Sequence, residues 1–201
     1  MNDSVMLRAF LAVPSDGMWV ESARGLQARL KDALPEASWT KPSSWHLTLK
    51  FFESISAEEA RAFGAAIAPD AFAAVPGEIR ASGAVVFPPR GPARVLGIGF
   101  APSSTLEEIA RLAAQAEVHA RSLGLSEEKR PFHPHVTLAR LRRAWPPEAV
   151  ESFRRELQDW TFPPWRARSC VLYQSRLERD GAVHVPLEEW SFTGGPRGVR
   201  A

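Results

Sequence analysis

Two short segments of the sequence share the pattern His-apolar-Thr-Leu, at residues 46–49 and 135–138, separated by close to half of the 201-residue chain. The unperturbed pKa of histidine is about 6.5, so an imidazole can donate or accept a proton near neutral pH. A threonine hydroxyl can donate a hydrogen bond to phosphate without adding charge. The paired motif therefore predicts phosphodiester chemistry without a metal, using one acid, one base and two neutral donors.

The stretches that contain these motifs alternate apolar and polar residues, which is typical of β-strands. Side chains two residues apart in a strand point to the same face, so His46 and Thr48 project together while Leu47 and Leu49 anchor the opposite face. The second motif has the same alternation. If the two strands lie side by side, one surface carries two imidazoles and two hydroxyls.

Hydrophobic periodicity and turn residues predict the remaining elements. Capping boxes are expected at residues 56–59, opening a short helix, and at residues 104–107. A hairpin is expected around the proline-rich residues 88–92, and a tight turn at residues 179–181. Strands are expected at residues 6–13, 45–52, 77–87, 94–100, 135–141, 166–175 and 183–190, and helices at 15–34, 104–122 and 147–160.

Length and composition indicate a single domain over residues 1–193 and a flexible tail over residues 194–201, since 45% of the residues are hydrophobic. Cys170 is the only cysteine, which excludes an intrachain disulfide and a multi-cysteine zinc site. No apolar run approaches the length of about 18 residues that spans a bilayer. The apolar stretch at the start of the sequence is too short for a secretory signal. We therefore expect a cytoplasmic protein that does not enter a membrane.

Most of the 25 basic residues are arginine, which grips phosphate oxygens in pairs, although a codon bias would give the same excess. The net charge of +2 is too small for a general nucleic-acid coat, so any affinity for RNA should be local. A basic cluster flanks the second motif and is either a solvated face or an electrostatic funnel for an RNA end. Its members are Lys129, Arg130, Arg140, Arg142 and Arg143.

The two motifs, the opening residues 7–14 and the closing residues 172–177 together resemble the RNA 2′,3′-cyclic phosphodiesterases of the two-histidine phosphoesterase superfamily, also called 2′-5′ RNA ligases. The resemblance extends from Met6 to Phe192. It implies a bilobal α+β fold with pseudo-twofold symmetry, in which two antiparallel sheets surround a central cleft and helices pack outside. It also implies RNA ends or nucleotides carrying a 2′,3′-cyclic phosphate as substrates, and no metal or other cofactor. We expect a monomer.

The resemblance also implies a role for each motif residue. His46 matches the proton donor and His135 the proton acceptor, while Thr48 and Thr137 match the phosphate-binding threonines. The implied reaction opens a 2′,3′-cyclic phosphate to a 2′-phosphate, and its reverse would join RNA ends through a 2′-5′ linkage.

Phe51 and Arg140, each five residues after a motif histidine, match substrate-side residues of the family. Strict alternation places both on the face opposite the histidines, so a bend or strand end is required there. The sequence departs from the family at residues 52–54, Phe-Glu-Ser, where relatives commonly have Leu-Gly-Glu. The change affects the turn after the first motif and removes no catalytic group.

Two other functions compete with this interpretation. A non-catalytic module that binds RNA ends or nucleotides would need the surface but not two proton-transfer groups. A metal-dependent phosphohydrolase could use His133 and His135, although Pro134 lies between them and no third ligand is obvious. Among the other residues, His119 and His184 are expected to be ordinary surface or satisfied polar positions, and Trp45 either packs in the core or stacks on a base.

Overall fold

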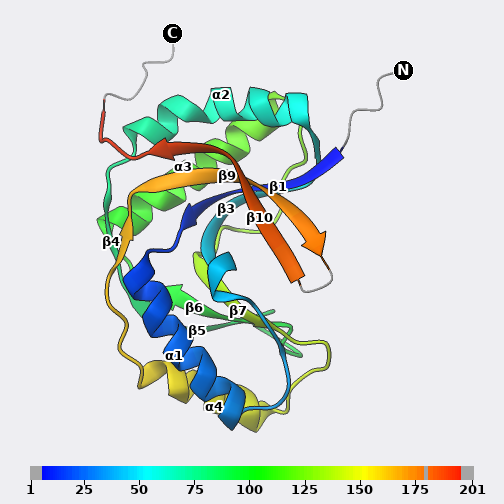
Figure 1. Cartoon of the computed structure of the whole chain (residues 1–201), viewed down its shortest axis with the longest axis vertical. Coiled ribbons are helices and arrows are strands. Elements are labelled where there is room, and N and C mark those ends of the chain that lie inside the picture. The colour runs from blue at the N-terminus through cyan, green and yellow to red at the C-terminus, as the bar shows by residue number, and fades with distance from the viewer. Residues whose placement is uncertain (1–5, 179–180, 196–201) are drawn as a thin grey trace.

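Two four-stranded antiparallel sheets form the framework of the computed structural model, which describes residues 6–178 and 181–195 (Figure 1). The first sheet has the order β10-β9-β1-β3 and the second has the order β2-β7-β6-β5. Two further strands, β4 and β8, pair with each other. The strands are β1 (Met6–Pro14), β2 (Ser38–Trp39), β3 (His46–Ser56), β4 (Gly77–Ile79), β5 (Ala81–Phe87), β6 (Val95–Phe100), β7 (His135–Arg140), β8 (Trp165–Ala167), β9 (Ser169–Glu178) and β10 (Gly181–Ser191).

Each sheet is covered by two helices on its outer side (Figure 1). α2 (Ala57–Ala73) and α3 (Ser104–Ser122) pack on the first sheet, whereas α1 (Gly17–Ala33) and α4 (Pro147–Gln158) pack together beside the second. The motif strands β3 and β7 belong to different sheets and contact each other where the two sheets meet. This arrangement confirms the bilobal α+β fold with antiparallel sheets and outer helices. The two motifs therefore come together by the packing of two sheets rather than by pairing within one.

One cluster of buried apolar side chains runs through both lobes, from Ala9 to Phe192. Leu47 in β3 and Val136 in β7 are fully buried in it. Removing apolar surface from water stabilises the fold by about 25 cal/mol per Å². The apolar residues between the motif histidines and threonines thus fix both strands to the core.

Side-chain caps open three of the helices. Asp16 Oδ1 accepts a hydrogen bond from the Trp19 amide at 2.9 Å and begins α1. The predicted capping box at the start of α2 is confirmed, since Ser56 and Glu59 bond reciprocally. The second predicted box is wrong: Ser103, not Ser104, caps α3 through its Oγ, which accepts from the Leu106 amide. In a Ser-Ser-Thr run only the backbone conformation decides which hydroxyl becomes the cap.

Several predicted elements differ from those observed. The single strand expected over 77–87 is two strands in different sheets, β4 paired with β8 and β5 paired with β6. The short second helix is 17 residues long and contains Pro69. β2 and the 3₁₀ turn η1 (Pro42–Ser44) were not predicted, because they are too short to show periodicity.

The ends of the last hairpin and of the chain are described only in part. The predicted turn residues Arg179 and Asp180 lie outside the described residues, as do residues 196–201 of the predicted tail. Within that tail, the Gly194 amide donates to the Ala74 carbonyl at 3.0 Å.

Candidate active site

The two motif histidines begin their strands with the same local geometry. Nδ1 of His46 lies 2.7 Å from the carbonyl oxygen of Ser44, and Nδ1 of His135 lies 2.7 Å from that of His133. A carbonyl oxygen only accepts, so each Nδ1 carries the hydrogen. Nε2 of each neutral ring is therefore left with its lone pair available for proton transfer.

One extra residue interrupts each motif strand at the same place. Neighbouring residues Leu11 and Ala12 of β1 pair with Lys50 and Thr48 of β3, which leaves Leu49 without its own partner. In β7 the residue passed over in the same way is Leu138, because Leu96 and Gly97 of β6 pair with Ala139 and Thr137. Such β-bulges shift the residues that follow them to the opposite face.

The bulges provide the bend that Phe51 and Arg140 require. Phe51 pairs with Phe10, whose ring stacks on His46 with centroids 4.5 Å apart, and the Arg8 guanidinium lies 5.4 Å from the Phe51 ring. The positive charge of Arg140 is close enough to lower the pKa of both His46 and His135. Arg140 thus lies near both motif imidazoles, and Phe51 lies beside Phe10 in the neighbouring strand.

The surroundings of His46 strongly favour its neutral form. Burial lowers the pKa of His46 to about 4, and the nearby His184 imidazole contributes in the same direction. His135 and Arg140 lower it further, whereas the hydrogen bond to Ser44 opposes these effects. Without substrate, His46 is therefore an unprotonated acceptor at neutral pH.

The surroundings of His135 act in the same direction. Burial lowers the pKa of His135, with smaller contributions from Arg140 and His133, while the hydrogen bond to the His133 carbonyl raises it. The Phe87 ring packs against this imidazole with centroids 4.8 Å apart. His135 is thus also neutral, as a general base must be.

His184, expected to be an ordinary surface or satisfied polar position, also contacts the first motif histidine, which the sequence did not predict. Its ring centroid lies 5.1 Å from that of His46 and 4.7 Å from that of Phe10. The sequence offered no signal for this contact, because His184 has no motif around it and reaches His46 only through the course of β9 and β10.

Trp45 does not stack on a base. Its side chain is buried in the core, and its indole N–H donates to Thr40 Oγ1 at 2.8 Å. The Thr40 hydroxyl in turn lies 2.8 Å from the Thr137 carbonyl oxygen. This Trp45–Thr40–Thr137 bridge connects the residue before His46 to the strand of the second motif.

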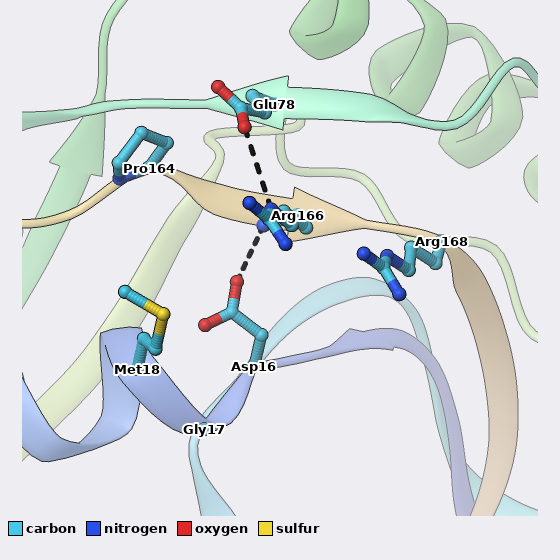
Figure 2. Close-up of a pocket in the computed structure, with 7 residues that line it drawn as sticks. All are labelled: Asp16, Gly17, Met18, Glu78, Pro164, Arg166 and Arg168. Atoms are coloured by element: carbon cyan, nitrogen blue, oxygen red, sulfur yellow. Dashed lines mark hydrogen bonds and ion pairs between the residues drawn. The ribbon is translucent and has the colours of Figure 1, made fainter.

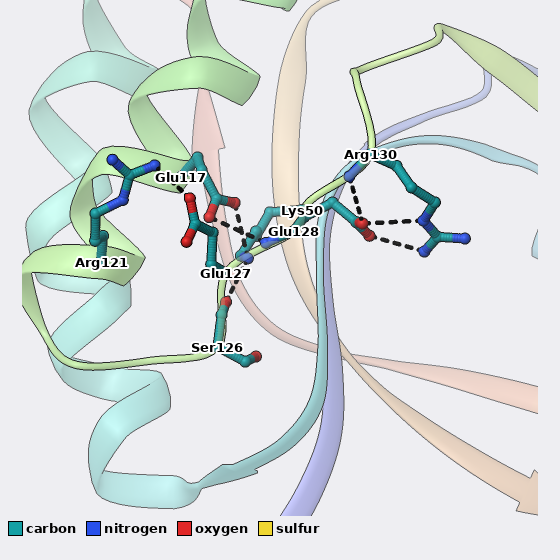
Figure 3. A network of polar contacts seen from close by, with 7 residues as sticks. All are labelled: Lys50, Glu117, Arg121, Ser126, Glu127, Glu128 and Arg130. Carbon is teal, nitrogen blue, oxygen red and sulfur yellow. Dashed lines mark hydrogen bonds and ion pairs between the residues drawn. The ribbon is translucent and has the colours of Figure 1, made fainter.

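A buried lysine fixes the loop that leads into the second motif (Figure 3). Lys50 Nζ, with a side chain only 1% exposed, lies 2.8 Å from Glu117 Oε2 on α3 and donates to the Ser126 carbonyl at 2.6 Å. The other carboxylate oxygen of Glu117 accepts from the Glu128 amide at 3.1 Å. The first motif strand and α3 therefore hold the loop that precedes His135.

The basic cluster is not uniform. Arg130 forms two hydrogen bonds, of 2.9 and 2.8 Å, with the Glu128 carboxylate, which lowers the pKa of Glu128 to about 2. Arg130 is thus paired locally, whereas Arg140 influences both motif histidines.

Metal ligands do not gather around the second motif. Over residues 6–178 and 181–195 there is no group of three or more His, Cys, Asp or Glu side chains arranged to hold a metal ion. His119 instead contacts Asp70, with Nε2 2.8 Å from Oδ2, which confirms a satisfied polar position.

A surface cavity of about 380 Å³ lies at the start of α1, just beyond Pro14, which pairs with His46 (Figure 2). Arg166 crosses it, donating its amide to Asp16 at 2.7 Å and placing its guanidinium 3.6 Å from Glu78. The cavity is lined by two acidic side chains, Asp16 and Glu78, and two basic ones, Arg166 and Arg168. Their charges balance. None of its lining residues belongs to a motif.

No helix within the described part of the chain is long and apolar enough to cross a membrane.

Comparison with known proteins shows a family match over most of the chain. The family model described as LigT like Phosphoesterase matches residues 19–97 and 99–184. An RNA 2′,3′-cyclic phosphodiesterase of Aeropyrum pernix is 32% identical over 169 residues, covering 82% of this chain and 94% of the relative. Another from Methanothermobacter thermautotrophicus is 26% identical, covering 90% and 97%.

Solved structures show the same fold. The crystal structure of E. coli LigT complexed with 3′-AMP superimposes with a TM-score of 0.71 at 22% identity, covering 94% of this chain and 99% of that one. TT0787 of Thermus thermophilus gives 0.69 at 25% identity with the same coverage. Because the family model matches most of the chain and the Aeropyrum relative is aligned over nearly its whole length, this protein belongs to the LigT-like phosphoesterase family.

Proposed function

We propose that this protein hydrolyses 2′,3′-cyclic phosphate ends of RNA or of nucleotides to 2′-phosphates, with His46 and His135 as an acid–base pair. The observation that carries the proposal is the matched geometry of the two imidazoles. Each has Nδ1 occupied by a backbone carbonyl and Nε2 free, and each is two residues before a threonine on the same strand face. Relatives aligned over most of this chain are named RNA 2′,3′-cyclic phosphodiesterases.

The proposed reaction moves two protons. Nε2 of neutral His135 takes a proton from water as the water oxygen bonds to phosphorus. The bond from phosphorus to the 3′ oxygen breaks, and that oxygen receives the proton from Nε2 of protonated His46. The product is a 2′-phosphate with a free 3′-hydroxyl, and exchange with solvent restores the two imidazoles.

Protonation of His46 depends on the substrate. Without substrate the pKa of His46 is about 4, so the acid form is scarce at neutral pH. A cyclic phosphate carries a negative charge, which raises the pKa of a nearby imidazole. The substrate thereby helps to create the acid that it needs.

Other residues would bind the phosphate and the nucleoside. The hydroxyls of Thr48 and Thr137 would donate to the non-bridging oxygens, and the Arg140 guanidinium would balance their charge. Phe51, with Arg8 above its ring, would contact the nucleoside. A 5′-hydroxyl in place of water would give a 2′-5′ linkage by the same steps.

The test is hydrolysis of 2′,3′-cyclic AMP in excess EDTA, with 2′- and 3′-phosphate products separated by chromatography. We expect the 2′-phosphate, and a loss of about 10²–10⁴-fold in kcat/KM for His46→Ala and for His135→Ala. His119→Gln, which alters a histidine bound to Asp70, should retain full activity. Unchanged turnover in either motif variant would reject the acid–base pair.

The competing functions have their own outcomes in this assay. Binding without turnover would indicate the non-catalytic module. The metal-dependent hydrolase would be indicated if the wild-type protein lost activity in EDTA and regained it with zinc. The His133→Ala variant would then also be inactive. The cytoplasmic location and the monomeric state stay predictions, to be tested by cell fractionation and by light scattering.

A further inference from the structure

The hairpin of β9 and β10 leaves the first sheet and lies over the start of the first motif. β9 pairs with β1 only from Val171 to Gln174, whereas its remaining residues pair with β10 alone. Leu187 is an extra residue in β10, since Pro186 pairs with Tyr173 and Glu188 with Leu172. The two-stranded end projects from the sheet (Figure 1). We call the part formed by residues 175–178 and 181–184 the ribbon.

The ribbon approaches the backbone that orients His46. β10 contacts η1, the turn whose last residue, Ser44, accepts the hydrogen bond from His46 Nδ1. A Cβ placed on Gly181 would lie 3.9 Å from Lys41, just before that turn. His184 is carried on this ribbon.

His46 is enclosed by two rings from other strands. The Phe10 ring of β1 stacks on the imidazole at 4.5 Å with an interplanar angle of 24°, and the His184 ring meets it at 5.1 Å with an angle of 74°. His184 is half-buried, and its nitrogens have no hydrogen-bond partner among the residues that the structure describes. His184 thus contacts a motif histidine through its ring and remains partly open to solvent.

We propose that His184 is a third functional imidazole of this site, a positioning residue that acts through His46. The inference rests on the proposed phosphodiesterase function and deepens it. Together with Phe10, His184 restricts rotation of the His46 ring, so that Nε2 is held in one direction. It also places a second titratable ring beside His46, so the proton affinity of one depends on the charge of the other.

The charged and titratable groups around the pair come from several strands. His46 faces His184 from β10 and His135 and Arg140 from β7. His184 faces His46 and also Tyr173 of β9, whose ring centroid lies 6.1 Å away. Burial lowers the pKa of His184 as well. A bound phosphate anion would offset the repulsion between these rings, which makes the acid form of His46 conditional on substrate.

The experiment compares two variants of the full chain. His184→Phe keeps a planar ring against His46 and Phe10 but cannot titrate, whereas His184→Ala removes both ring and charge. His119→Gln is the matched control for loss of a histidine outside the site. The readouts are the NMR titration of the His46 imidazole without substrate, and kcat and KM for 2′,3′-cyclic AMP as functions of pH.

In His184→Phe we expect the His46 titration and the acid limb of kcat/KM to move to higher pH, because a neighbouring positive charge has been removed. In His184→Ala we expect, in addition, a loss of kcat of about 10-fold to 10²-fold, because the His46 ring is no longer held in place. The change in KM should be smaller. A His46 titration in His184→Phe that coincides with that of the wild type would overturn the inference. The NMR readout needs no turnover, so failure of the wild type to hydrolyse the substrate would reject the proposed function alone.

Discussion

In the first motif the imidazole of His46 lies against Phe10 and beside His184, whereas in the second motif His135 packs against Phe87 at the end of an irregular loop. Both rings nevertheless donate Nδ1–H to the carbonyl two residues earlier, and both strands bulge three residues after the histidine. Local sequence thus determines the direction of each ring. The packing around it determines its affinity for a proton.

This comparison assigns different duties to two residues that look alike in the sequence. In the proposed mechanism the group that must be charged, His46, lies where burial, the positive charge of Arg140 and two further imidazoles oppose its charge, so its acid form depends on the bound anion. A group that must be neutral needs no such control. Four experiments could break or sharpen the contrast.

The largest effect should separate the acid from the base. In a substrate whose 3′ bridging oxygen is replaced by sulfur, the leaving thiol has a pKa of about 8.5, so it departs without a proton. His46→Ala should lose about 10²–10⁴-fold in kcat/KM on the normal substrate but little on the sulfur substrate. His135→Ala should lose comparably on both. The opposite pattern, measured by steady-state kinetics, would exchange the two roles.

The second experiment removes the buried lysine that holds the loop before His135. Lys50→Ala leaves Glu117 without its ion pair and frees the Ser126 carbonyl, which should cost about 3–5 kcal/mol of unfolding free energy. In NMR spectra the imidazole signals of His135 should shift more than those of His46, since the loop leads into the second motif. Urea unfolding gives the stability.

A surface ion pair supplies the control for Lys50. Arg24 and Glu21 are 3.5 Å apart with side chains 59% and 70% exposed, so Arg24→Ala should change stability by less than about 1 kcal/mol. Equal effects of the two substitutions would show that the Lys50 network does not hold the loop.

The third experiment uses acid. The pKa of His46 falls from 6.5 in the unfolded chain to about 4 in the folded one, so the folded state binds fewer protons between these values. The stability that this neutral ring contributes is present above pH 6.5 and is lost as pH falls toward 4, by about 3 kcal/mol. Urea unfolding of His46→Gln at pH 7, 5 and 4 should therefore show a flatter pH dependence than the wild type. If His135→Gln flattens the curve more, the contrast between the two motifs is wrong.

The sequence predicted that each motif histidine and its threonine share a strand face, because alternation in a strand depends only on neighbouring residues. It could not predict where alternation fails: Leu49 and Leu138 become extra residues only because of how β1 and β6 pair beside them. The same limit explains the missed contact of His184, which depends on the course of a hairpin that begins far from His46 in the chain. Sheet register and packing between distant segments, rather than local pattern, supplied these parts of the site.

The smallest effect concerns the bridge that joins the two motifs despite their different surroundings. Thr40→Val keeps the shape of the side chain but leaves the buried indole N–H of Trp45 without its acceptor, at a cost of about 1–3 kcal/mol of unfolding free energy. The hydroxyl's bond to the Thr137 carbonyl is lost as well, so the position of β7 relative to His46 should loosen and kcat should fall with little change in KM. Thr161→Val, at an exposed threonine, should leave both stability and kcat unchanged. A Thr40 variant that is destabilised but fully active would show that the bridge serves the core alone, and that each motif keeps its geometry from its own strand.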